Sequence, residues 1–149
     1  MRKTGLVVLG LMAALTAASP AAAARWWYLG RTGAGDFLYL DGDLVVRDGT
    51  KYVVLNGKTV FGSPRTDSAA GSTFQAFVAC GMDLDTHYYR RRWVDADGKE
   101  LRQDAFETLA PDETALAKSF ACTDPASWAG RGFELVRDPA ADAEKRKAQ

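Results

Sequence analysis

Three consecutive arginines, Arg90-Arg91-Arg92, form the most concentrated group of charges in the sequence. They lie in a β-prone segment that also holds Tyr88, and side chains on a strand alternate between its two faces. We therefore expect Arg90 and Arg92 to share a face with Tyr88, and Arg91 to take the other. A face with two guanidinium groups and a phenol could bind an anionic polymer or an acidic patch of a protein. Alternatively, the charges protect an edge strand from aggregation.

Residues that could catalyse hydrolysis are sparse. A serine or cysteine nucleophile needs a base within hydrogen-bonding reach, and the only histidine of the sequence is His87. No serine lies in the G-x-S-x-G turn that exposes the nucleophile of many hydrolases. The sequence therefore predicts no catalytic residue, and an unrecognised hydrolase is the class of function that it supports least.

Two pairs of acids, Asp41-Gly42-Asp43 and Asp83-Leu84-Asp85, have a spacing found in calcium loops. An EF-hand loop also needs a glutamate at its twelfth position, where these segments place Tyr52 and Val94. Aspartates beside glycine or in short polar segments more often form turns. No glycine-rich segment carries the lysine of a phosphate-binding loop, so we predict neither a metal site nor a cofactor.

The two cysteines of the sequence, Cys80 and Cys122, are expected to form a disulfide, because an even cysteine count in an exported chain favours one. With one histidine they are too few for a zinc site. Phe74, Ala76 and Val78 share a strand face with Cys80, so the bond should point inward. Its 42-residue separation would stabilise the fold by about 4 kcal/mol on the chain-entropy model.

The N-terminus has the three parts of a secretory signal peptide. Arg2 and Lys3 precede an apolar run over residues 5–18, and alanines at 21–24 follow as a cleavage site. The run is too short for a comfortable transmembrane helix, although a retained anchor is the alternative. We predict a signal peptide at 1–24 and no membrane span after its cleavage.

Length and charge limit the remaining classes. Without Arg2 and Lys3, 17 of the 19 basic residues remain against 19 acidic residues, which gives a net charge of −2. A nucleic-acid-binding protein would show a basic excess, so we exclude that class. The mature length suits one domain, which we place at 25–137. A polar C-terminal tail, frayed or loosely helical, is expected at 138–149.

Short β-prone segments separated by turn residues dominate the domain. Strands are expected at 26–29, 37–40, 44–46, 52–55, 59–61, 73–80, 86–94, 99–104 and 133–136. Asp48-Gly49 and Asn56-Gly57 predict hairpin turns, and Gly42 predicts a bulge or tight turn. Residues 62–72 predict a polar loop.

One helix is expected to begin at Pro111, because proline suits the first helical position. Asp112 and Glu113 would lie near the positive end of its dipole, and Leu116 and Phe120 would share a face. The predicted fold class is therefore α+β: a mainly antiparallel β-sheet with one short helix packed on it and one disulfide.

Several of these segments resemble the surface-adhesin protein E-like family. The similarity begins with Trp27-Tyr28-Leu29-Gly30, Tyr39-Leu40-Asp41, Leu44-Val45-Val46-Arg47 and the strand at 52–55, and continues through Cys80, the strand at 88–93, Asp97-Gly98, Leu109-Ala110-Pro111 and Cys122. The resemblance implies an antiparallel sheet packed with a helix and clamped by a disulfide, in proteins that bind host matrix proteins at the bacterial surface. This sequence departs from the family by having no tryptophan at 52–55 and no cysteine for a lipid anchor.

Together these features predict an exported, non-catalytic, adhesin-like protein of the bacterial envelope, located in the periplasm or secreted to the cell surface. Its partner would be a protein or an anionic polymer of the envelope or extracellular matrix, bound by Tyr88, Arg90 and Arg92. The alternative is a periplasmic inhibitor or small-ligand-binding protein that presents the loop at 62–72, an analogy with other small disulfide-bonded domains.

Overall fold

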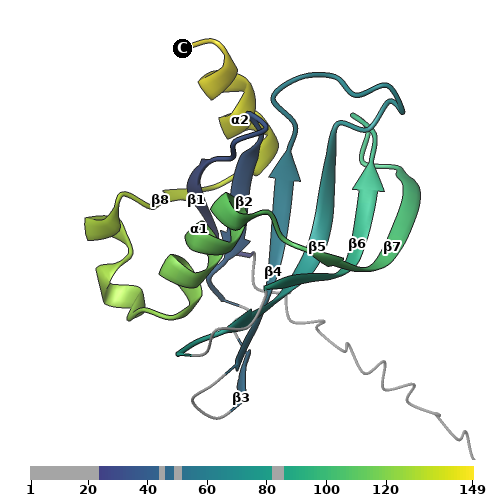
Figure 1. The fold of residues 1–149 in the computed structure, drawn as a ribbon. Helices are drawn as coiled ribbons and strands as arrows, with labels where there is room; N and C mark the ends of the chain where they lie inside the picture. The colour runs from purple at the N-terminus through teal and green to yellow at the C-terminus, as the bar shows by residue number, and fades with distance from the viewer. Residues whose placement is uncertain (1–23, 44–45, 49–51, 82–85) are drawn as a thin grey trace, which may run out of the picture.

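The structure is a computed structural model that describes residues 24–43, 46–48, 52–81 and 86–149. These residues form eight strands, two α-helices and two short 3-10 helices (Figure 1). In chain order the elements are β1 (Trp26–Arg31), β2 (Phe37–Asp41), β3 (Val46–Asp48), β4 (Tyr52–Val60), β5 (Gly71–Ala79), β6 (His87–Val94), β7 (Glu100–Thr108), α1 (Pro111–Ala121), η1 (Pro125–Ser127), η2 (Ala129–Arg131), β8 (Glu134–Val136) and α2 (Pro139–Lys147).

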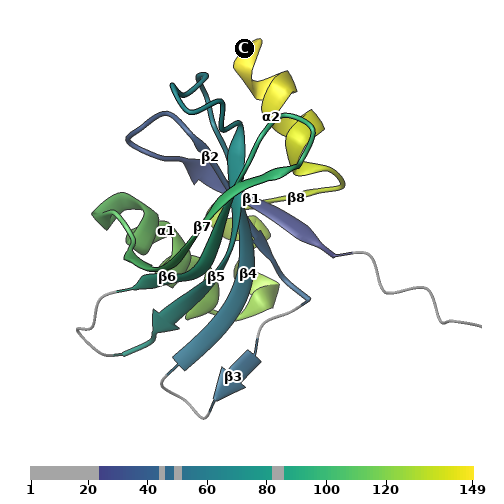
Figure 2. The same cartoon turned by 90° about the vertical axis from the view of Figure 1, so that its right-hand side faces the viewer.

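The strands form one antiparallel sheet in the order β7-β6-β5-β4-β2-β1-β8, and β3 pairs separately with β4. The two α-helices lie on opposite sides of this sheet (Figure 2). We call the side on which α1 packs the covered face and the other side the open face. The predicted α+β class with a mainly antiparallel sheet is confirmed.

The main core lies between the covered face and α1. Alternate apolar side chains of the strands and of α1 make up its buried centre: Leu29, Leu38, Leu40, Val53, Leu55, Phe74, Ala76, Val78, Tyr88, Ala117 and Phe120. Each large apolar side chain removed from water contributes about 1.5–3 kcal/mol to folding. This face therefore supplies most of the stabilisation that the sheet needs.

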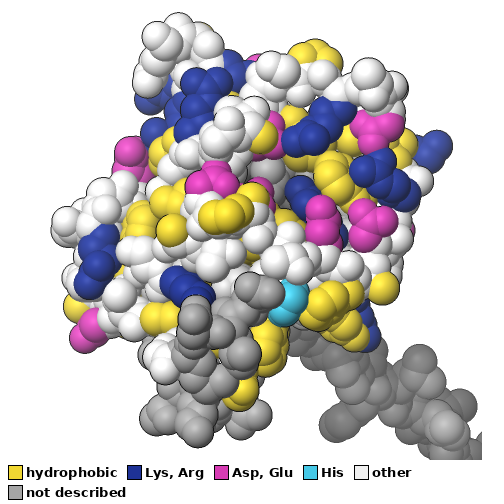
Figure 3. Space-filling view, in the orientation of Figure 1, with side chains coloured by type: hydrophobic (Ala, Val, Ile, Leu, Met, Phe, Trp, Pro, Cys, Tyr) yellow, Lys and Arg dark blue, Asp and Glu magenta, His cyan; other side chains and the backbone are white. Residues whose placement is uncertain are grey.

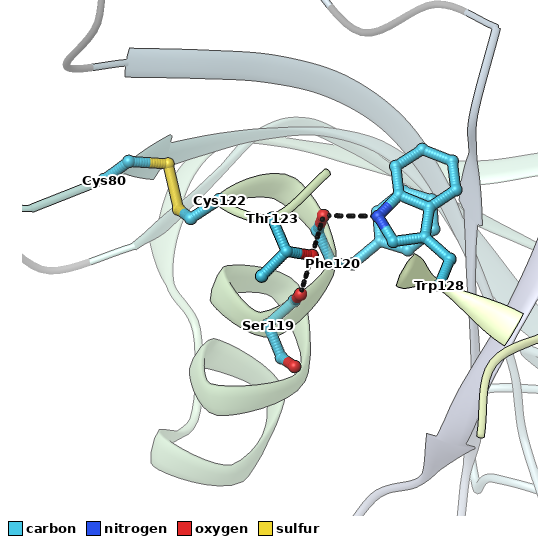
Figure 4. The surroundings of a disulfide bond; sticks show 6 residues. All are labelled: Cys80, Ser119, Phe120, Cys122, Thr123 and Trp128. Atoms are coloured by element: carbon cyan, nitrogen blue, oxygen red, sulfur yellow. Dashed lines mark hydrogen bonds between the residues drawn. A yellow bond between two sulfur atoms is a disulfide. The ribbon is translucent and has the colours of Figure 1, made fainter. Parts of the chain in front are cut away.

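The disulfide between Cys80 and Cys122 joins the end of β5 to the end of α1, with the two Cα atoms 5.4 Å apart (Figure 4). The chain then turns through η1, so that the ring of Trp128 stacks on that of Phe120 at a centroid distance of 3.8 Å. The Trp128 Nε1–H donates a hydrogen bond of 2.9 Å to the Phe120 carbonyl. The predicted disulfide and its inward orientation are confirmed.

Helix α1 begins as its sequence predicts, with Pro111 at the first helical position. The Glu113 carboxylate accepts the Ala110 N–H at 3.1 Å, which satisfies a donor that the helix leaves unpaired. The Asp112 carboxylate accepts the Gly33 N–H at 2.5 Å, and this hydrogen bond lowers the pKa of Asp112. These contacts fix the start of α1 against the loop between β1 and β2.

The hairpin predicted at Asn56-Gly57 is wrong, because β4 runs through this dipeptide without a turn. Gly57 is the register partner of Phe74 on β5, and a Cβ on Gly57 would lie 2.3 Å from the Phe74 ring. Glycine is therefore required here to make room for an aromatic ring, not to supply a turn conformation. Packing between two strands overrides the local turn preference.

The turns predicted at Asp48-Gly49 and Gly42 and the loop predicted at 62–72 agree better with the structure. β3 and β4 pair antiparallel, as a hairpin at Asp48-Gly49 requires, although its turn at 49–51 lies outside the described residues, as do Leu44 and Val45. At Gly42, β2 has ended and the Asp41 carboxylate accepts the Asp43 N–H at 2.9 Å, which makes a turn. The loop predicted at 62–72 ends earlier, because β5 begins at Gly71.

The polar segment at 138–149 contains a second helix, α2, which packs on the sheet instead of forming a frayed tail. The Asp138 carboxylate caps it by accepting the N–H groups of Ala140 and Ala141. Ala143 is buried against Phe37 and Tyr39 on the open face. The apolar stripe of this helix is narrow, so the composition of the segment is also typical of a polar tail.

Candidate anion-binding groove

Strand β6, which holds the three consecutive arginines, does not alternate regularly between Tyr88 and Arg91. The register between β5 and β6 passes from Thr73 opposite Arg92 to Gln75 opposite Tyr89, so β6 holds one residue more than β5 at this point. Arg90 has a φ of 52°, in the left-handed region, which marks it as the extra residue of a β-bulge. The bulge resets the alternation of side chains along β6.

Tyr88 consequently lies on the covered face with Arg91, while Arg90 and Arg92 are exposed on the open face. Tyr88 is 1% exposed, and its ring packs edge-on to Phe74 at a centroid distance of 4.4 Å. Burial raises its pKa well above the ordinary value. The prediction that Tyr88 shares a ligand-binding face with Arg90 and Arg92 is therefore wrong. Arg91 lies on the face opposite to Arg90 and Arg92, as expected.

Arg90 and Arg92 line a cleft of about 250 Å³ on the open face, which we call the cation groove. Its lining comes from β1, β4, β5 and β6: Trp26, Asn56, Gly57, Lys58, Thr73, Phe74, Gln75, Arg90 and Arg92. The described residues therefore give the groove three cations and no carboxylate. Lys58 and Trp26 lie far from the arginines in sequence, and the sheet register brings them together.

The cations of the groove have few partners. The Lys58 ammonium lies 4.7 Å from the centre of the Trp26 ring, and the Arg90 guanidinium 5.1 Å from that of Tyr89. Arg92 approaches the Glu100 carboxylate at 3.7 Å, and both side chains are about half exposed, so this pair contributes little. Within the described part of the chain, Lys58 and Arg90 form no ion pair. Their charge is therefore available to a ligand.

A second group of arginines lies on the covered face around Trp93, and we call it the Trp93 cluster. Arg91, Arg65 and Arg102 place their guanidinium groups 4.2, 5.8 and 4.1 Å from the centre of the Trp93 ring. Each is paired with an acid: Arg91 with Glu107 at 2.9 Å, Arg65 with Asp36 at 2.6 Å, and Arg102 with Asp67. Figure 3 shows basic and acidic side chains alternating around apolar ones over β5, β6 and β7 on this face.

Two further clefts adjoin the cation groove on the open face. One of about 300 Å³, which we call the apolar cleft, is lined by Val54, Gln75, Ala76, Phe77, Tyr89 and Phe106, and shares Gln75 with the groove. The other, of about 560 Å³, extends between the sheet and α2 and shares Lys58 and Thr73 with the groove. Its α2 side carries Asp138, Glu144 and Lys147, so its charge is mixed.

His87 and the paired aspartates are the remaining side chains that the sequence offers for catalysis or metal binding. The His87 and Phe106 ring centroids lie 4.3 Å apart, and the His87 Nδ1 lies 3.3 Å from the Thr108 hydroxyl. Among the residues that the structure describes, no three His, Cys, Asp or Glu side chains gather as a metal site would need. Asp41 forms a turn as predicted, while Asp83 and Asp85 lie outside the described residues.

Comparisons with family models, with curated proteins and with solved structures find no match to this chain. The similarity to the surface-adhesin protein E-like family therefore stays a prediction. No helix among residues 24–149 that the structure describes is long and apolar enough to span a bilayer.

Proposed function

We propose that this protein is an exported, non-catalytic binding module of the bacterial envelope, and that its cation groove binds an anionic group of its partner. The observation that carries the proposal is that Lys58, Arg90 and Arg92 line one cleft together with Trp26, and that the described lining holds no carboxylate. Cations that fold into a cleft without acids repel one another, and a bound anion relieves that repulsion.

The side-chain types in the groove suit carboxylate or phosphate ligands. Guanidinium groups offer paired donors that match the two oxygens of a carboxylate, and two arginines line the groove together with a lysine. Trp26 supplies an apolar wall that excludes water from one side of the ligand. Because the groove is open to solvent, we expect moderate affinity that weakens as salt is added.

Export is the second part of the proposal. A secretory signal at residues 1–24 would deliver the chain to the periplasm, or beyond it to the cell surface. The Cys80–Cys122 disulfide supports this placement, because such bonds persist in oxidising compartments. Intact-mass analysis of the protein from bacterial cells should find a chain that begins at Arg25 with both sulfurs oxidised. A full-length, reduced chain would contradict export.

The binding part is tested by calorimetric titration of the mature protein with a short oligo-glutamate peptide. The variant Arg90→Asn/Arg92→Gln removes two charges from the groove, and asparagine tolerates the left-handed conformation at position 90. We expect affinity to fall about ten-fold or more, since charge-assisted hydrogen bonds contribute about 1.5–3 kcal/mol. The control Arg65→Gln/Arg102→Gln removes the same charge from the Trp93 cluster and should bind almost normally. If both variants lost affinity equally, net charge and not the groove would explain the binding, and the proposal would be overturned.

A periplasmic inhibitor that presents the loop after β4 is the second candidate, and the structure offers one observation in its favour. Side chains at 63–68 are exposed, yet the loop is held by the Arg65–Asp36 and Arg102–Asp67 pairs and by buried Ala69. A loop fixed in this way needs little ordering when it binds an enzyme. Shortening it at 63–68 should abolish inhibition of an envelope enzyme if this candidate is correct, and leave oligo-glutamate binding unchanged.

A further inference from the structure

The apolar cleft beside the cation groove exposes aromatic side chains that the core does not bury. Phe77, Tyr89 and Phe106 are 37, 42 and 62% exposed on the open face of β5, β6 and β7. Phe77 stacks on Tyr52 with ring centroids 5.0 Å apart, and Phe106 packs on His87. These contacts order the rings while leaving a concave apolar surface in water, which is typical of binding sites.

The cleft and the groove are parts of one surface. They share Gln75, and the Arg90 guanidinium lies over the ring of Tyr89, which lines the cleft. A ligand that reaches both parts would place an anionic group on Arg90 and Arg92, and an apolar group against Phe106. Among anionic polymers, a polyuronic or phosphate-rich glycan has no side chain to fill the cleft, whereas a peptide can carry both groups a few residues apart.

We infer that the partner of this surface is an acidic peptide segment with an aromatic or branched aliphatic side chain among its carboxylates. This inference rests on the proposed function, because the groove must supply the charge contacts. The apolar side chain inserts beside Phe77, Tyr89 and Phe106, and the carboxylates bind Lys58, Arg90 and Arg92. Gln75, at the boundary, can donate and accept hydrogen bonds with the peptide backbone between them.

Calorimetry with two synthetic peptides tests the inference. Both consist of glutamates, with phenylalanine at the centre of one and serine at the centre of the other, and an oligouronate serves as the glycan probe. Burying an aromatic side chain contributes about 1.5–3 kcal/mol, so the phenylalanine peptide should bind about ten-fold or more tightly than the serine peptide. The oligouronate should bind no better than the serine peptide.

Two variants locate the effect. Phe106→Ser should reduce the preference for phenylalanine to roughly three-fold or less, while affinity for the serine peptide stays the same. Leu135→Ser removes a side chain of similar exposure, 58%, from β8 outside the cleft, and should keep the preference intact. Both positions are exposed, so we expect both variants to fold.

The outcomes separate this inference from the proposed function. Equal affinity for both peptides, or tighter binding of the oligouronate, would overturn the inference, and the proposed function would stand as long as Arg90→Asn/Arg92→Gln still weakened binding. If that arginine variant bound both peptides as the parent does, the groove and the inference built on it would both be wrong.

Discussion

The Trp93 cluster and the cation groove lie on opposite faces of the sheet, meet at β6, and use the same kinds of side chain. In the cluster, Arg91 is 6% exposed, lies between the Tyr88 and Trp93 rings, and is paired with Glu107. In the groove, its sequence neighbours Arg90 and Arg92 are exposed to solvent, and Arg92 makes one weak contact with Glu100. Alternation along β6 sends adjacent arginines to these two environments, and the bulge at Arg90 places Tyr88 on the covered face with Arg91.

The difference is one of partners rather than of residue type. An arginine whose guanidinium already has a carboxylate, a hydroxyl acceptor and two ring faces has little to gain from a ligand, and it contributes to the fold instead. An arginine without such partners contributes little to the fold and retains its binding capacity. A charge cluster in a sequence can therefore serve both purposes, divided by the face on which each member lies.

The largest effect should come from the bond that holds the covered face together. Cys80→Ser/Cys122→Ser should lower the free energy of unfolding by about 4 kcal/mol, because the unfolded chain regains the freedom of a long loop. Denaturant unfolding would measure this, and the reduced parent protein should match the variant. At denaturant concentrations where both proteins remain folded, oligo-glutamate should bind them equally, since the disulfide lies away from the groove. A loss below about 1 kcal/mol would show that packing alone fixes α1.

Neighbouring arginines should respond very differently to the same substitution. Arg91→Ala removes the side chain between the Tyr88 and Trp93 rings and its hydrogen bond to Ser72, and should cost about 2–3 kcal/mol of stability. Arg92→Ala, at the next position, should cost less than about 0.5 kcal/mol. The same unfolding experiment gives both values. Similar costs for the two variants would contradict the division of the triplet between the faces.

The contact between α2 and the open face should affect the stability of the protein at high pH. Burial, and then the hydrogen bond from the Tyr39 hydroxyl to the Asp142 carboxylate at 3.0 Å, raise the pKa of Tyr39. The fold thus favours the neutral phenol, so its contribution is complete below the pKa of about 10 that tyrosine has in the unfolded chain, and is lost as the pH rises above it.

Tyr39→Phe should accordingly cost about 1–2 kcal/mol at neutral pH through the lost hydrogen bond, and should make the loss of stability above pH 10 less steep. Tyr28 and Tyr88, whose pKa values burial also raises, should retain part of that loss. Unfolding curves at neutral and alkaline pH compare the two proteins. An unchanged alkaline slope would mean that α2 does not shield Tyr39 from water.

Sequence patterns predicted the features that depend on local chemistry. The disulfide followed from the even cysteine count, the start of α1 from Pro111, and most strands from β-prone segments between turn residues. The hairpin at Asn56-Gly57 failed because Gly57 makes room for the Phe74 ring on the neighbouring strand. A loose helix was one of two expectations for 138–149, but its packing on the sheet was missed because Ala143 gives little apolar signal. The face of Tyr88 could not be predicted, since one inserted residue reverses the alternation. Trp26 and Lys58 were not predicted as site residues, because only the register of the sheet brings them into the same groove as the arginines.

The most direct test of the division between the two faces is an NMR titration of the mature, nitrogen-15-labelled protein with oligo-glutamate. It would follow the side-chain Nε–H signals of arginine and the indole N–H signals of tryptophan. The signals of Arg90, Arg92 and Trp26 should move together and saturate, while those of Arg65, Arg91, Arg102 and Trp93 stay in place. Movement of the second set alone, or uniform small shifts across both, would contradict the assignment of the cation groove as the binding surface.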